Sequence, residues 1–178
     1  MKGLVLVTAC ASLLLVGMIS GQSFASSGHM YISEWGSFGI IEPGKFNLAQ
    51  QIAVDDERNI YVADTGNSRI QKFTNSGEFL SSFEINGVKD GELQSPVGIA
   101  IYENNVYVVD DKQHNVQKFD GDGNFILKWG GFGINDGEFN QPKGITIDSD
   151  GIVYVTDSKN HRIQKFTSDG EFLSAFGI

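Results

Sequence analysis

Apolar and polar residues alternate along this chain in a pattern that occurs three times. In the last copy, residues 145–147 and 153–155 are almost wholly apolar, whereas residues 163–166 and 172–176 alternate between apolar and polar. Short continuous apolar runs are typical of strands buried on both faces, and alternation is typical of strands with one face in water. Each copy therefore predicts four strands, of which the inner two lie between neighbours.

The copies share the tripeptide Gln-Lys-Phe in the third predicted strand. Its phenylalanine recurs at Phe73, Phe119 and Phe166. A fixed repeat of about this length indicates a unit that buries its apolar faces against its neighbours. Four antiparallel strands per repeat is the pattern of a β-propeller blade. We predict an all-β fold of about three four-stranded antiparallel blades, with repeats at about residues 37–83, 84–130 and 131–178.

The predicted turns agree with this arrangement. A glycine lies in the hairpin between the third and fourth strands of each repeat, where positive φ is needed: Gly77, Gly123 and Gly170. An aspartate ends the second strand of each repeat, where it can accept backbone N–H bonds of the following turn: Asp64, Asp110 and Asp157. We expect these carboxylates to cap turns.

At these residues the chain resembles the NHL-repeat family. The last copy matches the family pattern in residues 142–145, 154–157, 160–166 and 170–172. The first copy departs from it with Ala-Gln-Gln at residues 49–51, and the second has Asn115 where the other copies have arginine. The resemblance implies blades of a six-bladed ring, so that three blades are half of one ring or a fragment of a longer array.

Residues 31–36 repeat the pattern of the fourth strand ahead of the first complete copy. They predict a thirteenth strand, one more than three blades need. Closed propellers contain about four to eight blades. Two chains can complete a ring as a two-fold dimer, so a homodimer is a possible assembly.

The N-terminal segment has the composition of a secretory signal. Lys2 precedes an apolar run at residues 3–19, and small residues stand at the two positions that a signal peptidase inspects, Ser23 and Ala25. We predict a signal peptide at residues 1–25 and a mature propeller domain at 26–178, secreted or extracytoplasmic. If the segment is not cleaved, it anchors the chain at the cell surface, because about 17–25 apolar residues span a bilayer.

The charge balance narrows the choice of partners. The chain has 22 acidic and 13 basic residues, a formal net charge of −9 at pH 7. Nucleic-acid binding is driven by clustered lysine and arginine, so we expect no nucleic-acid partner. RNA binding, a function implied by the resemblance to some NHL domains, is kept as a second alternative.

The candidate binding residues lie in loops, because loops carry function on rigid scaffolds. The predicted set is Asn67, Arg69, His114, Asn115, His161 and Arg162. His114 and His161 occupy equivalent positions, and the resemblance includes amidating lyases with a histidine-bound zinc. A zinc site takes three or four ligands, however, and no third ligand matches. We therefore predict no metal and no cofactor.

No catalytic motif is present: the sequence lacks a Gly-x-Ser-x-Gly elbow, a His-Glu-x-x-His pair and a phosphate loop. We predict no catalytic residue and no enzymatic activity. The expected function is that of a binding or scaffolding module for a protein or a small ligand. The first alternative is a metal-dependent lyase similar to the peptide-amidating lyases.

Overall fold

The computed structural model describes residues 33–40, 42–83 and 86–177. The chain divides into two units, Met1–Glu34 and Trp35–Ile178, and all that follows concerns the second. The predicted signal peptide lies outside the described residues. Within the described ranges, no helix is long and apolar enough to cross a membrane.

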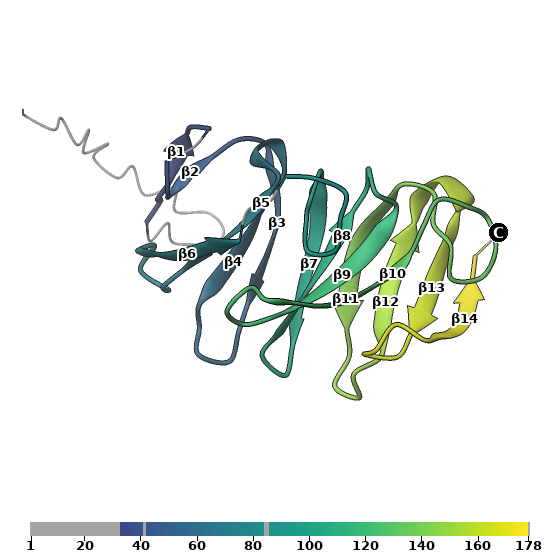
Figure 1. Ribbon diagram of the computed structural model, residues 1–178. Helices are drawn as coiled ribbons and strands as arrows, with labels where there is room; N and C mark the ends of the chain where they lie inside the picture. Colours follow the sequence, from purple (N-terminus) through teal and green to yellow (C-terminus); the bar gives the residue numbers. More distant parts are fainter. Residues whose placement is uncertain (1–32, 41, 84–85, 178) are drawn as a thin grey trace, which may run out of the picture. The chain divides into compact units, whose positions relative to one another are not determined.

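Three antiparallel sheets of four strands, here called blades 1 to 3, make up the second unit (Figure 1). Within each blade the strands are paired in sequence order. The strands of blade 1 are β3 (Ala49–Val54), β4 (Ile60–Asp64), β5 (Arg69–Phe73) and β6 (Phe79–Phe83). Those of blade 2 are β7 (Pro96–Tyr102), β8 (Asn105–Asp110), β9 (Asn115–Asp120) and β10 (Phe125–Gly130). Those of blade 3 are β11 (Pro142–Ile147), β12 (Val153–Asp157), β13 (Arg162–Phe166) and β14 (Phe172–Phe176).

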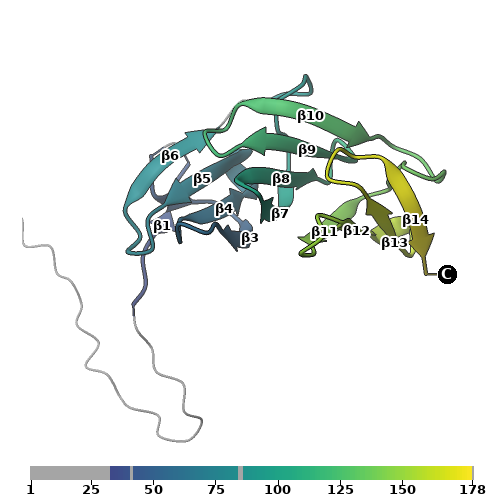
Figure 2. The ribbon, with the colours of Figure 1, turned by 90° about the horizontal axis from the view of Figure 1, so that it is seen from below.

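These blades confirm the predicted all-β class and the four-stranded antiparallel repeat. The remaining elements are small. A parallel pair, β1 (Ser37–Phe38) and β2 (Lys45–Phe46), precedes blade 1, and single 3₁₀ turns, η1 (Thr65–Asn67) and η2 (Ser158–Asn160), follow the second strands of blades 1 and 3. Figure 2 shows that the first strands β3, β7 and β11 lie on one side of the unit and the fourth strands on the other.

The prediction of a strand at residues 31–36 is wrong for its described part, since residues 33–36 are not in a strand. Such a segment would be the fourth strand of a blade ahead of blade 1, and the described residues include no third strand there with which it could pair. The segment still packs on blade 1, because the ring centroids of Trp35 and Phe73 are 4.8 Å apart.

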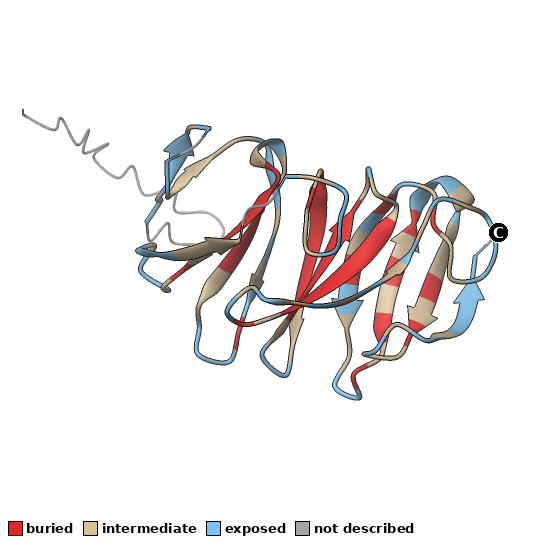
Figure 3. Cartoon of the chain, viewed as in Figure 1, coloured by how far each residue is buried: buried red, intermediate tan, exposed pale blue. Residues whose placement is uncertain are grey.

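The core consists of two layers, one on each side of blade 2. Alternate residues of β8 point to opposite faces, as the period of a strand requires. Val106 and Val108 pack with Tyr61 of blade 1, whereas Tyr107 and Val109 pack against blade 3. The middle of blade 2 is therefore buried throughout, as Figure 3 shows. This packing explains why the second strand is apolar on both faces.

Hairpin glycines let the blades approach closely. Gly123 has φ +88°, and a Cβ placed on it would lie 2.6 Å from the ring of Phe83 in blade 1. Gly170 has φ +80°, and a Cβ there would lie 2.7 Å from the ring of Trp129 in blade 2. A side chain at either position would both strain the turn and collide with the preceding blade. Glycine is therefore required at these positions for two reasons: the positive φ predicted from the sequence and the close approach of the preceding blade.

A matched pair of leucines tests the interblade core. Leu93, which is 1% exposed, packs with Ile70 of blade 1, and Leu80 on β6 is 48% exposed. We expect Leu93→Ala to lower the free energy of unfolding by about 2–5 kcal/mol because it leaves a cavity. Leu80→Ala should change it by no more than about 0.5 kcal/mol. Urea unfolding followed by circular dichroism measures both, and equal losses would contradict this assignment of the core.

Candidate binding site

The aspartate that ends each second strand is fully buried: Asp64, Asp110 and Asp157. In blade 1, one carboxylate oxygen of Asp64 accepts the backbone N–H of Asn47 at 2.7 Å. The other accepts Arg69 Nε at 2.8 Å, Asn67 Nδ2 at 2.8 Å and Gln71 Nε2 at 3.0 Å. The expected capping is therefore one part of a larger buried network.

Arg69 extends this network to the loop ahead of β3. Its Nη2 donates to the carbonyl oxygens of Glu42 (3.1 Å) and Lys45 (2.9 Å), and the side chain is buried. Arg162 repeats the arrangement in blade 3, with Nε bonded to Asp157 and Nη2 bonded to Asn135 and Glu138 carbonyls. Each guanidinium group holds in place the loop ahead of the first strand of its own blade.

Blade 2 reaches the same result with different residues. Asn115 replaces the arginine, is buried, and its side-chain oxygen has no hydrogen-bond partner among the described residues. Gln113, at the position of Asn67, donates instead to the carbonyls of Gly87 at 3.0 Å and Glu92 at 2.8 Å. Since glutamine is longer than asparagine, its amide reaches the loop that the arginine side chains reach in the other blades.

The two histidines bind other parts of the protein or face solvent. The Nδ1 atom of His114 accepts the backbone N–H of Gln141 at 3.0 Å, and its ring lies 5.1 Å from that of Phe132. Ser68, at the equivalent position in blade 1, donates to the carbonyl of Gln94 at 2.8 Å. His161 is exposed on blade 3. Within the described residues no group of three or more His, Cys, Asp or Glu is placed to hold a metal.

Of the six residues predicted to bind a ligand, Asn67, Arg69 and Asn115 point into the scaffold, and Arg162 is largely engaged there. His114 bonds the backbone just ahead of blade 3, and the His161 residue is exposed to solvent. Asn67, Arg69 and Arg162 belong to the loop networks of their own blades. Most of the predicted binding residues therefore serve as an internal framework in this structure.

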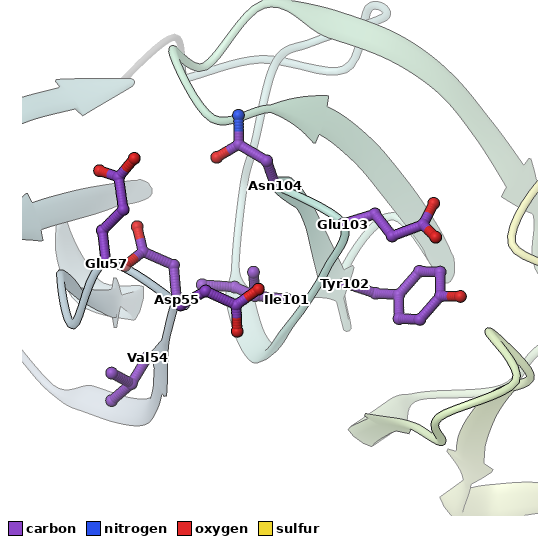
Figure 4. A pocket seen from close by; sticks show the side chains of 8 residues that line it. Val54, Asp55, Glu57, Ile101, Tyr102, Glu103 and Asn104 are labelled. Carbon is purple, nitrogen blue, oxygen red and sulfur yellow. The ribbon is translucent and has the colours of Figure 1, made fainter.

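A cavity of about 580 Å³ lies elsewhere, between the β3–β4 loop of blade 1 and the β7–β8 loop of blade 2 (Figure 4). Its lining combines apolar residues at the ends of β3 and β7 with polar and acidic loop residues: Val54, Asp55, Asp56, Glu57, Ile101, Tyr102, Glu103 and Asn104. Pockets for small ligands have volumes of about 300–1,000 Å³. This cavity is the candidate site.

The carboxylates that line the cavity differ in burial and in hydrogen bonding. Asp55 is buried and accepts the backbone N–H of Asn59 at 2.7 Å and the hydroxyl of Tyr61 at 3.3 Å. Asp56, Glu57 and Glu103 are exposed. Asp55 therefore shapes the β3–β4 loop, and the exposed carboxylates provide the negative charge that a ligand would meet.

The cavity belongs to a strongly negative end of the unit. The loops between first and second strands, and those between third and fourth strands, lie at one end of the blades because adjacent strands are antiparallel (Figure 1). These six loops contain ten carboxylates and one basic residue, Arg58. The carboxylates are Asp55, Asp56, Glu57, Glu78, Glu103, Asp122, Asp148, Asp150, Asp169 and Glu171. We call this surface the acidic end.

Local hydrogen bonds keep negative charge at this end. The side-chain amide of Asn124 donates to Asp120, at the end of β9, and lowers the pKa of that carboxyl below its ordinary value. The backbone N–H of Ile152 likewise lowers the pKa of Asp148. Both carboxyls thus stay ionised to a lower pH than free aspartate does. Sequence reasoning missed the acidic end, although counting charges in the hairpin loops alone would have found it.

Comparison with known proteins finds a family model that matches two of the repeats. The NHL repeat model matches residues 46–73 and 139–166. A 75-residue stretch of the chain is 37% identical to the protein named brain tumor from Drosophila melanogaster, covering 42% of this chain and 7% of that protein. The resemblance predicted from the sequence is confirmed.

Among solved structures, a streptogramin B lyase matches with a TM-score of 0.59 and 19% identity, covering 73% of this chain and 40% of the lyase. Virginiamycin B lyase from Staphylococcus aureus matches with a TM-score of 0.60 and 18% identity, covering 78% of this chain and 44% of the lyase. The chain thus spans less than half the length of each. At these identities the likeness shows the propeller-type fold alone.

Replacing Arg69 tests the framework role of the loop network. We expect Arg69→Ala to lower the free energy of unfolding by about 3–5 kcal/mol, because it leaves the buried carboxylate of Asp64 without its cation. The control is Lys112→Ala, which removes an exposed charge and keeps the backbone N–H that donates to Asp110. Urea unfolding compares them. A small loss in Arg69→Ala, equal to that of the control, would mean that the arginine is not structural.

Proposed function

Because this chain contains NHL repeats, we propose that it is a binding module whose acidic end holds a cationic partner, namely a basic segment of another protein. One observation carries the proposal: the six hairpin loops of the acidic end contain ten carboxylates and one arginine. A surface of one sign raises the local concentration of oppositely charged ligands and speeds their association. The same charge disfavours the phosphate backbone of a nucleic acid.

The lining of the cavity supports binding rather than chemistry. Exposed carboxylates of Asp56 and Glu103 can pair with lysine or arginine side chains, while Ile101 offers apolar surface to their aliphatic stems. Asp55 is already bonded to Asn59 and Tyr61. We therefore propose a non-catalytic module that recognises charge and length of a basic segment.

We also propose that the module works outside the cytoplasm. This part of the proposal is supported by sequence alone: an apolar run behind Lys2 and small residues at positions 23 and 25. If residues 1–25 are retained, the module is anchored at the membrane surface.

The test is titration of the chain with an oligolysine peptide by isothermal calorimetry. We expect salt-sensitive binding, because exposed charges are screened at high ionic strength. The variant Asp56→Asn/Glu103→Gln should bind about tenfold more weakly, since each exposed ion pair contributes up to about 1 kcal/mol. The matched control Asp90→Asn/Asp136→Asn removes two exposed carboxylates at the opposite end and should bind like the unchanged chain.

Equal weakening in both double variants would show attraction to overall charge and would overturn the proposal, as would no binding at low salt. Two further results would replace it by the alternatives. Bound zinc that disappears in His114→Ala or His161→Ala would favour the metal-dependent lyase. A tight, salt-sensitive gel shift with RNA would favour the RNA-binding function.

A further inference from the structure

The first strand of blade 1 leaves apolar residues uncovered that the other blades bury. Ile99 of β7 is 1% exposed and Ile145 of β11 is 5% exposed, because each packs on the preceding blade. Their equivalent in β3, Ile52, is 63% exposed, and Val54, on the same face of the strand, is also exposed. We call this surface the leading face of blade 1.

Blade 3 has the complementary vacancy on its far side. At the end of the fourth strand, Phe83 packs on Phe119 of blade 2, and Trp129 packs on Phe166 of blade 3. Their equivalent, Phe176, is 51% exposed. It lines a cavity of about 310 Å³ together with Ser158, His161 and Ile163. We call this surface the trailing face of blade 3.

The two internal interfaces show what fills such a cavity. Leu93 from blade 2 packs with Ile70 of blade 1, and Phe139 from blade 3 packs with Val116 of blade 2. Ile163 is the equivalent of Ile70 and Val116. The residue equivalent to Leu93 and Phe139 is Phe46, just ahead of the leading face. The trailing face is therefore shaped for an apolar side chain at that position of a blade.

Polar contacts repeat across the internal interfaces with the same spacing. Lys72 Nζ donates to the carbonyl of Gly121 at 3.4 Å, and Lys118 Nζ donates to that of Ser168 at 3.0 Å, each in the next blade. In blade 3 the equivalent donor is Lys165. The hairpin position that would receive it is Asn75 of blade 1, since Asn75 is equivalent to Gly121 and Ser168.

The exposed histidine fits the same series. Ser68 and His114 each bind the backbone just ahead of the next blade, at Gln94 and Gln141. At the trailing face this position is His161, and the backbone it would bind is that of residues 47–48. Its accessibility is then a consequence of the missing neighbour.

We propose that the trailing face of blade 3 binds the leading face of blade 1 in a second copy of this chain. The partner must present an apolar side chain, a backbone segment and a hairpin carbonyl at the spacing of a blade edge, and blade 1 has all three. A contact between unlike faces closes a ring when its rotation allows. Two copies give six blades, within the range of about four to eight for closed propellers.

One residue opposes this closure. The ring of Trp35 lies on Phe73, and a Cβ on Gly77 would come within 2.5 Å of it. This is the place that Phe83 and Trp129 take on blades 2 and 3, and therefore the place that Phe176 of the second copy needs. Trp35 thus covers part of the leading face and must leave it when the ring closes.

The test is the mass of the 178-residue chain in solution by light scattering after size exclusion, over a range of concentrations. Moderate salt is needed because each chain carries a net charge of −9, which opposes association. We expect a dimer whose dissociation constant rises at least about tenfold in Phe176→Ala. The matched control is Leu173→Ala, since Leu173 lies on the same strand, is 48% exposed and does not line the cavity. It should leave the dimer unchanged.

Trp35→Ala should change the dissociation constant of the dimer in the opposite direction to Phe176→Ala. Removing the competing ring should lower the dissociation constant, whereas a merely structural role would weaken or not affect the dimer. A monomer at every concentration, a ladder of larger species without a dimer, or equal effects of Phe176→Ala and Leu173→Ala would each overturn the proposal. Circular dichroism of Trp35→Ala shows whether blade 1 is intact, and the Phe176→Ala result stands without it.

Discussion

A single blade has two apolar faces and cannot bury either by itself. This constraint accounts for the core of the protein: β8 sends Val106 and Val108 toward blade 1 and Tyr107 and Val109 toward blade 3. Stability in such a stack is a sum of the units and their interfaces. The outer faces of the stack lack a described neighbour, and it is there that apolar residues such as Ile52 and Phe176 are exposed.

The buried aspartates organise the long loops that precede the first strand of each blade. Asp64, Asp110 and Asp157 accept backbone and side-chain donors, and through Arg69, Gln113 or Arg162 they fix the loop ahead of the blade's first strand. The loop residues that look suited to recognition are thereby used for cohesion. The opposite end of the blades needs no such network, since its hairpins are short. It is free to concentrate carboxylates, as the acidic end does.

Much of the fold could be predicted from the sequence, because period-two alternation, hairpin glycines and strand-ending aspartates are local signals. The strand predicted at residues 31–36 failed in its described part because a strand needs a partner, and the described residues include no third strand ahead of blade 1 for it to pair with. The direction of Arg69 was also hidden, since an arginine in a loop has the same pattern whether it faces water or a buried carboxylate. The cavity joins loops of two blades far apart in sequence, so no local motif marks it.

Amide hydrogen exchange, resolved by blade at a protein concentration low enough for a single chain, tests the dependence of each blade on its neighbours most directly. If apolar faces are stabilised only by adjacent blades, the strands of blade 2 exchange most slowly, and those of blades 1 and 3 exchange faster from their uncovered faces. Equal protection in all three blades, or greatest protection in blade 1 or blade 3, would contradict this account of the fold.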